Sequence, residues 1–384
     1  MKIVTAIDSF KGSMTSVEAG NAAAAGFKKA DPSAEVIVRP LADGGEGTVE
    51  ALIEGMNGQR EEVLVSGPLE EKVNCVYGII KDSMTAVIEM SGAAGITLIP
   101  KSSLNPLDTT TYGVGEVIKE AINKGCRRFI VGIGGSATND GGVGMLQALG
   151  FEFLDKDGNE IAHGAKGLKN LASIKDSNVI AELKECKFMV ACDVTNPLCG
   201  INGCSAVFGP QKGASPDMVK DMDKWMGHYA EITKKLYPDA DAEYPGTGAA
   251  GGLGFAFLNF TNAELKSGIR IILEETRLEE YIKDADLVIT GEGMLDFQTA
   301  MGKAPIGVAK LAKKYSKPVI AFAGGVTKDA DACNENGIDA FFPIVRGVTS
   351  LEKALIPENA KYNLTAAAEQ VMRLLLIKRG EEFK

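Results

Sequence analysis

Both ends of this 384-residue chain alternate strand and helix patterns in a way that the middle does not. Near the N-terminus, residues 2–7 and 35–41 predict buried strands, and a helix is expected between them over 16–29. The same alternation returns at 284 and ends in a helix expected over 365–379. It is typical of a parallel sheet covered by helices. We therefore predict one α/β domain built from both chain ends.

The middle of the chain predicts an inserted, mixed α/β domain. Three alternating runs, EEVLVSGP, KVNCVYGII and MTAVIEMS, indicate strands separated by turns. Amphipathic helix patterns follow within 216–237 and 264–283. We expect the domain boundaries to place 1–60 with 284–384, and 61–283 in the insert. Ligand loops on both domains predict an active-site cleft between them.

Composition excludes several functional classes. The net charge of −10 argues against a general nucleic-acid binder, which needs a basic face. No apolar run is long enough to span a membrane, and the N-terminus lacks the pattern of a secretory signal, so a cytoplasmic protein is expected. Only two histidines are present, and the seven cysteines fit no familiar zinc spacing. Histidine-based catalysis and a zinc centre are therefore not expected.

Glycine is more frequent in this chain than in an average protein. Forty-five of the 384 residues are glycines, roughly 12% against a usual share of about 7%. Many stand in short polar blocks after predicted strands, where open α/β sheets bind ligands. Five blocks combine glycine or a turn residue with acids, and they lie at 8–12, 43–48, 132–142, 193–198 and 291–299.

The chemistry of these blocks suits an anionic substrate. The glycines at 44 and 45 let the backbone approach a ligand, and Asp43 and Glu46 beside them could hold Mg²⁺ or accept a proton. The block at 132–142 follows a strand and precedes a helix, which is a natural cradle for phosphate oxygens. Asp193 with Asn196 could bind a metal or a hydroxyl group. Each block could instead be a plain turn or helix cap.

Two acids and a lysine in the last block suit Mg²⁺ and phosphate contacts: Glu292, Asp296 and Lys303. Phosphoryl transfer needs phosphate cradles, metal-binding carboxylates and one acid near the accepting hydroxyl, but neither histidine nor cysteine. The blocks together favour an enzyme of this class.

Two alternative functions remain open at this stage. A nucleotide-dependent dehydrogenase would use the GxGxxG at Gly246, Gly248 and Gly251, but no predicted strand precedes it. A non-catalytic sugar-acid-binding regulator would have a similar cleft without paired acids. A P-loop is excluded, because the nearest match at 301–304 lacks the hydroxyl residue.

The order of motifs resembles the type-1 glycerate kinase family over essentially the whole chain. The blocks that carry the resemblance are DSFKGSMTSVEA, PLADGGEGTVEAL, NPLDTTTYGVGEVI, GIGGSATNDGGVGML, ACDVTNPLCG, VFGPQKGA, PGTGAAGGLG and GEGMLDFQTAMGKAPIGVA. The resemblance implies ATP-dependent phosphorylation of D-glycerate with Mg²⁺, with 2-phosphoglycerate favoured and 3-phosphoglycerate possible. It also implies that the domain from both chain ends is flavodoxin-like. The chain departs from the family pattern at Met294, where an arginine is usual.

The motifs and the family resemblance together predict roles for individual residues. The protein is expected to be a monomer or a homodimer. The predicted catalytic residues are Asp193, Lys11 and Asp43. The predicted metal ligands are Glu46, Glu292 and Asp296. The predicted substrate- or phosphate-binding residues are Asp8, Ser9, Gly44, Gly45, Gly134, Gly135, Ser136, Asn139, Asp140, Asn196 and Lys303.

Overall fold

The computed structural model describes residues 1–45 and 47–379, which form two compact units. Unit 1 combines Met1–Asp43 and Glu50–Asn57 with the chain from Ile269 onward, and unit 2 combines Gly44–Val49 with Gly58–Gly268. A parallel sheet from both chain ends and an inserted mixed sheet confirm the predicted α/β class. That the units are domains with boundaries at 60 and 284 stays a prediction.

Unit 1 is built on a five-stranded parallel sheet with the order β13-β12-β11-β1-β2. Its strands are β1 (Lys2–Ile7), β2 (Glu35–Pro40), β11 (Leu287–Leu295), β12 (Val319–Val326) and β13 (Ala340–Pro343). Its helices are α1 (Ser16–Ala30), α2 (Thr48–Gly55), α10 (Gly268–Glu275), α11 (Leu278–Lys283), α12 (Phe297–Ala300), α13 (Ala304–Lys314), α14 (Ala332–Glu335), α15 (Leu351–Ala354) and α16 (Pro357–Arg379).

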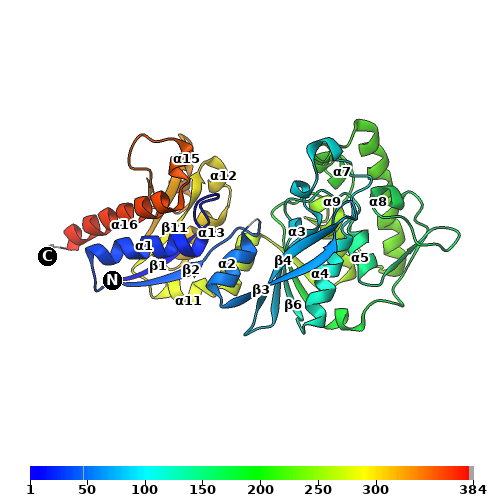
Figure 1. The fold of residues 1–384 in the computed structure, drawn as a ribbon, viewed down its shortest axis with the longest axis horizontal. Helices are drawn as coiled ribbons and strands as arrows, with labels where there is room; N and C mark the ends of the chain where they lie inside the picture. The colour runs from blue at the N-terminus through cyan, green and yellow to red at the C-terminus, as the bar shows by residue number, and fades with distance from the viewer. Residues whose placement is uncertain (46, 380–384) are drawn as a thin grey trace. The chain divides into compact units, whose positions relative to one another are not determined.

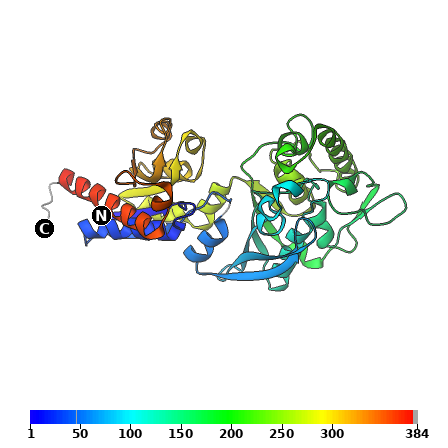
Figure 2. The ribbon, with the colours of Figure 1, turned by 45° about the horizontal axis from the view of Figure 1, so that its top comes forward.

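Helices α1 and α16 lie side by side in unit 1 (Figures 1 and 2). Thr365 donates a hydrogen bond of 3.0 Å to the carbonyl oxygen of Ala22, and a side chain at Gly26 would clash with the α16 backbone. Both helices pack on alternate strand residues, including Ile3 and Phe322, in one buried core. The two chain ends therefore close a single hydrophobic core.

Strand β11 is longer than its sequence indicated. The polar block at 291–299 was expected to follow its strand, but β11 continues through it to Leu295 and pairs with β12 up to that residue. Glu292 is opposite Ala323, and Met294 is opposite Gly325. A Cβ at Gly324 would lie 2.6 Å from the carbonyl oxygen of Gly293, so glycine permits this close pairing. Glu292 is therefore held by a strand.

Unit 2 contains a six-stranded mixed sheet with the order β10-β9-β6-β5-β4-β3. Its strands are β3 (Gly58–Ser66), β4 (Lys72–Ile80), β5 (Thr85–Glu89), β6 (Arg128–Gly132), β9 (Lys187–Ala191) and β10 (Ala263–Lys266), and β7 (Glu152–Leu154) pairs with β8 (Ser173–Lys175) separately. Its helices are α3 (Ser91–Ala94), α4 (Tyr112–Asn123), α5 (Val143–Ala148), α6 (Ala165–Leu168), α7 (Cys204–Phe208), α8 (Pro216–Leu236) and α9 (Ala249–Phe260).

The parallel half of this sheet comprises β5, β6, β9 and β10, so their carboxyl ends share one edge. The helix expected within 216–237 is present as α8. The range 264–283 was expected to contain an amphipathic helix, and it contains α10 and α11. Strand β10 precedes these helices and pairs with β9.

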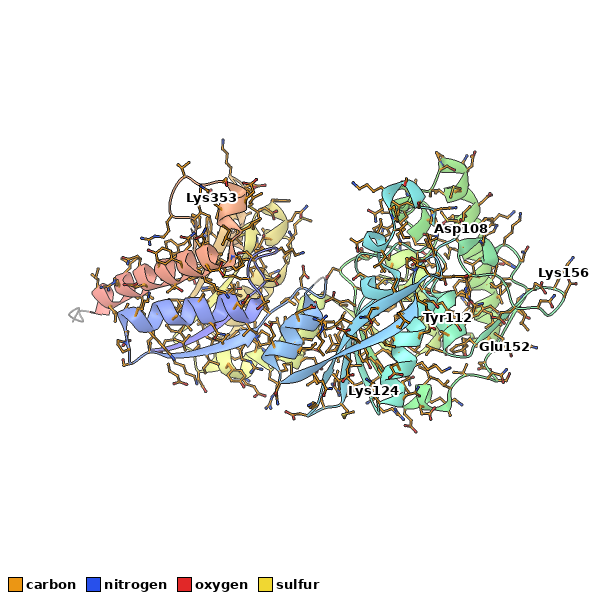
Figure 3. The ribbon with its side chains drawn as sticks, viewed as in Figure 1. Asp108, Tyr112, Lys124, Glu152, Lys156 and Lys353 are labelled. Atoms are coloured by element: carbon orange, nitrogen blue, oxygen red, sulfur yellow. The ribbon has the colours of Figure 1, made fainter. Side chains whose placement is uncertain are left out.

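Figure 3 shows the side chains of both units. In unit 2, the labelled Asp108 pairs with Lys166 at 2.7 Å, and the ring of Tyr112 packs against that of His163 at a tilt of 39°, with centroids 4.8 Å apart. His163 is therefore engaged in a structural contact. Among residues 1–45 and 47–379, no helix combines the length and apolar character needed to cross a membrane.

Candidate active site

The candidate site lies at the carboxyl edge of the parallel sheet in unit 1. The strand order reverses between β1 and β11, since β2 lies on one side of β1 and β11, β12 and β13 on the other. Open α/β sheets bind ligands at this kind of switch point. The amide of Asp8, directly after β1, donates a hydrogen bond of 2.8 Å to the carbonyl oxygen of Gly291 in β11.

A cavity of about 660 Å³ opens at this edge, and we call it the sheet-edge pocket. Its charged end carries Asp8, Lys11, Asp43, Glu292, Asp296 and Lys303. Its apolar wall comprises Ile344, Val345, Leu351, Ala354, Leu355 and Ala360. The remaining lining residues are Ser9, Phe10, Ser13, Gly293, Met294, Gly324, Gly325, Thr349, Ser350 and Asn363. The pocket falls in the range of about 300–1,000 Å³ that is usual for small-molecule sites.

Three carboxyl groups influence one another in the charged end. Burial, followed by the charge of Asp43, raises the pKa of Asp8 to about 7, and Glu292 contributes further. Burial also raises the pKa of Glu292, against a lowering contribution from the hydroxyl of Thr299. Like charges in a partly buried site oppose simultaneous ionisation, so this cluster favours a proton or a cation among its members.

A tight loop presents Lys11 at the pocket. Phe10 and Met14 exchange two backbone hydrogen bonds of 2.9 and 3.0 Å, and both side chains are buried in the core. Between them Gly12 has a φ of 76°, which favours glycine. Lys11 is consequently exposed at the tip of an anchored turn. The hydroxyl oxygen of Ser13, in the same turn, is buried without a hydrogen-bond partner among the described residues.

Thr299 links the acids of β11 and α12. Its hydroxyl donates to the Glu292 carboxylate at 2.5 Å, and its backbone amide donates to Asp296 at 2.9 Å. Asp296 is the N-cap of α12 and lies 3.8 Å from the ammonium of Lys303. Asp296 therefore has a structural role in addition to any ligand contact.

The donors present fit Mg²⁺ bound together with phosphate oxygens. The part of the chain that the structure describes contains no group of three or more His, Cys, Asp or Glu residues arranged to hold a metal ion. Mg²⁺ commonly binds one or two carboxylates and completes its shell with substrate phosphates and waters. The carboxylates of Asp8, Asp43 and Glu292 are oxygen donors of this kind.

A second polar edge lies in unit 2, where β5, β6 and β9 end. Asp193 is exposed after β9, and its carboxylate accepts a hydrogen bond of 3.1 Å from the amide of Gly268. Glu89, the last residue of β5, accepts a hydrogen bond of 3.0 Å from the amide of Val49. Glu89 was not among the predicted site residues, although it is an acid at the end of a strand, as Asp193 is an acid two residues after β9.

The glycines of the second block pack within unit 2. A Cβ at Gly44, whose φ is 87°, would lie 2.6 Å from the Cα of Gly268 and 2.7 Å from the Cβ of Ala191. Gly44 therefore brings the backbone close to the ends of β9 and β10, and Gly45 follows it. Glu46, a predicted metal ligand, lies outside the described residues.

The block at 132–142 is mostly buried, with Gly134 and Gly135 exposed. Asp140 accepts hydrogen bonds from the amides of Thr111 at 2.8 Å, Gly142 at 3.1 Å and Gly144 at 3.3 Å. The carboxylate of Asp140 therefore occupies the start of α5, where the sequence had predicted that a phosphate group would bind. Only the exposed glycines of the block are open to a ligand.

Three other predicted binding residues make contacts within unit 2. The amide of Asn139, fully buried, donates to the hydroxyl of Ser205 at 2.9 Å. Ser136 is also buried and bridges to Gly95. Asn196 donates to the carbonyl oxygen of Asn202 at 2.8 Å. These contacts position loops whose ligand roles stay predictions.

The GxGxxG glycines serve close packing in unit 2. Added Cβ atoms would lie 2.2 Å from the carbonyl oxygen of Pro197 at Gly248, and 2.1 Å from that of Thr138 at Gly251. The preceding residues form turns, and no strand leads into the motif. The strand-turn-helix context of a dinucleotide site is absent from this described segment.

Comparison with known proteins defines the family. The model of the glycerate kinase family matches residues 3–376. The chain is 50% identical over 354 residues to a glycerate kinase of Bacillus subtilis strain 168, covering 92% of this chain and 93% of the relative. The chain belongs to the glycerate kinase family.

Two further comparisons cover nearly the entire chain. A glycerate 2-kinase of Escherichia coli K12 is 48% identical over 377 residues, which is 98% of each chain. A crystal structure of a candidate glycerate kinase 2 from Salmonella typhimurium LT2 superposes with a TM-score of 0.92 at 46% identity, covering 99% of this chain and all of that one. This membership of the glycerate kinase family confirms the resemblance, the phosphotransferase class and the use of ATP that a kinase family implies.

Proposed function

We propose that this glycerate kinase family member transfers the γ-phosphoryl group of ATP to the 2-hydroxyl group of D-glycerate, with Mg²⁺, and releases 2-phosphoglycerate and ADP. The observation that carries the proposal is the match to the family over residues 3–376. The relative named glycerate 2-kinase, 48% identical, supports the 2-hydroxyl as acceptor. Transfer to the 3-hydroxyl is the alternative product to test.

The charged end of the sheet-edge pocket is our candidate for the phosphate site. Lys11 and Lys303 would neutralise phosphate oxygens, and one or two of the carboxylates of Asp8, Asp43 and Glu292 are the candidate ligands of Mg²⁺. When bound, Mg²⁺ would neutralise charge on the phosphates. Ser13 offers a hydroxyl that has no described partner and could donate to a phosphate oxygen.

The acceptor hydroxyl loses its proton as its oxygen bonds to phosphorus and the bond to ADP breaks. We assign that proton to the carboxylate of Asp193, which is exposed and held in place by the amide of Gly268. A positioned carboxylate of this kind contributes roughly 10²–10⁴-fold as a general base. A cytoplasmic location and a monomeric or homodimeric state stay predictions.

A coupled assay of ADP release tests the proposal, with ATP and Mg²⁺ in the presence and absence of D-glycerate. ADP release that depends on D-glycerate supports the proposed reaction. Phosphorus NMR of the product then distinguishes 2-phosphoglycerate from 3-phosphoglycerate. Absence of D-glycerate-dependent ADP release from the folded protein would refute the proposed reaction.

A further inference from the structure

The sheet-edge pocket extends well beyond its charged end. The charged end lies where β1 and β11 finish, and the apolar wall begins at Ile344, directly after the edge strand β13. Gly324 and Gly325 of β12 line the pocket between them. Strand β13 lies three strand positions away from β1 in the sheet, which corresponds to a distance of about 14 Å between the two strands. The ligand must therefore be elongated to use the full pocket.

Two leucine side chains of the apolar wall are exposed to solvent, and a bound ligand would cover them. Leu351 is 71% exposed and Leu355 is 36% exposed, although both line the cavity. On the other side Met294 is 49% exposed, and its methyl group lies close over Gly325. Apolar side chains that line a concave surface favour a ligand group with apolar, poorly hydrated surface.

Glycerate does not suit this part of the pocket. It is a three-carbon acid with no apolar surface, and a cavity of about 660 Å³ is far larger than it requires. A nucleoside triphosphate has both features, a charged end and an apolar aromatic end joined by a ribose. Its length also suits a pocket that crosses three strand spacings.

We propose that the apolar wall of the sheet-edge pocket binds the adenine ring of ATP, with the phosphates directed toward Lys11 and Lys303. In this assignment Leu351, Ala354 and Leu355 cover one face of the ring. Asn363, half-buried on α16 beside the wall, supplies an amide with both a donor and an acceptor. That pair complements the amino group and ring nitrogen of adenine. The inference rests on the proposed ATP-dependent function.

Binding of Mg-ADP without glycerate, measured by calorimetry, tests the assignment. Ala354→Trp fills the apolar wall, so we expect its dissociation constant to rise at least roughly ten-fold. The matched control is Lys353→Trp, because Lys353 is the exposed neighbour on α15 and does not line the pocket (Figure 3). The control should change the constant by less than about two-fold. Thermal unfolding confirms that both variants are folded.

A second variant keeps the test decisive if Ala354→Trp fails to fold. Asn363→Ala removes the amide, and we expect the preference for Mg-ADP over Mg-GDP to fall by at least roughly five-fold. If the wild-type protein phosphorylates D-glycerate but neither variant alters nucleotide binding, the adenine assignment is wrong and the proposed function stands. If the variants weaken Mg-ADP binding but no glycerate is phosphorylated, the assignment stands and the proposed reaction fails.

Discussion

The amide of Asp8 donates a 2.8 Å hydrogen bond to the carbonyl oxygen of Gly291, which precedes Glu292. This contact joins the ends of the two strands at the point where the strand order reverses. It places a carboxyl group on each strand at the same edge of the sheet. Burial, followed by the charge of Asp43, raises the pKa of Asp8 to about 7, and Glu292 on the neighbouring strand adds to this shift.

Asp8→Asn should change stability in a pH-dependent manner. The pKa of Asp8 is about 7 in the folded protein and 3.8 ordinarily, so between these values the folded state holds a proton that the unfolded chain has released. The contribution of Asp8 to stability is therefore complete below about pH 4 and lost as pH rises through about 7. Relative to wild type, the variant should gain about 3 kcal/mol between about pH 5 and about pH 8.

Urea unfolding without Mg²⁺ at these two pH values checks this prediction. Asp157→Asn, at an exposed position in unit 2, is the control and should show no such difference. An Asp8→Asn effect of equal size at both pH values would contradict the raised pKa.

Asp140→Asn should destabilise the protein. One oxygen of Asp140 accepts from both the amide and the hydroxyl of Thr111, and the other accepts from Gly142. An NH₂ group in place of either oxygen would face a buried donor, at a cost of about 3 kcal/mol. Denaturant unfolding measures the loss. An unchanged unfolding free energy with a raised KM would instead make Asp140 a ligand residue.

The sequence predicted the acids that follow strands closely, because a run of apolar residues followed by an acid can be recognised from the order of residues alone. Asp8 directly follows β1 and Asp43 lies three residues after the end of β2, and both line the sheet-edge pocket. Asp140 has the same local appearance, but its hydrogen bonds to Thr111 join residues distant in sequence. Whether an acid faces a ligand or the protein's own amides depends on such tertiary contacts.

The apolar wall could not be predicted in the same way. Leu351 begins the short helix α15 and Leu355 is its C-cap, and the sequence of this segment resembles any amphipathic segment. Their position in the pocket depends on β13 being the edge strand, which sequence does not specify. Glu89 was missed for a different reason. An acid at the end of an alternating strand resembles the other polar residues of that pattern, so the local sequence does not distinguish it.

Asp193→Asn should retain the fold and lose turnover. The amide oxygen of asparagine can still accept from Gly268, so the loop should keep its position. The variant cannot take up the hydroxyl proton, and we expect kcat to fall by roughly 10²–10⁴-fold. Steady-state kinetics with D-glycerate measures this. A folded variant with nearly normal kcat would exclude Asp193 as the base.

Met294→Arg should strengthen nucleotide binding. Met294 lines the sheet-edge pocket and is 49% exposed, so an arginine there can reach the charged end with little loss of packing. A charge-assisted hydrogen bond contributes about 1.5–3 kcal/mol, which predicts a KM for ATP lower by roughly ten-fold.

The matched control for this change is Met301→Arg, at a position that is 75% exposed and does not line the pocket. Initial rates over a range of ATP concentrations give both values of KM. Equal changes in the two variants would mean that added positive charge acts generally, without a contact at Met294.

Glu292→Gln in the D-glycerate kinase assay tests the central claim, that the charged end of the sheet-edge pocket carries out phosphoryl transfer. Glutamine keeps the shape of the side chain and an acceptor for the hydroxyl of Thr299, but it removes the negative charge. We predict that kcat falls by at least roughly 10²-fold while thermal unfolding stays close to wild type. Wild-type kcat and KM in the folded variant would contradict the account.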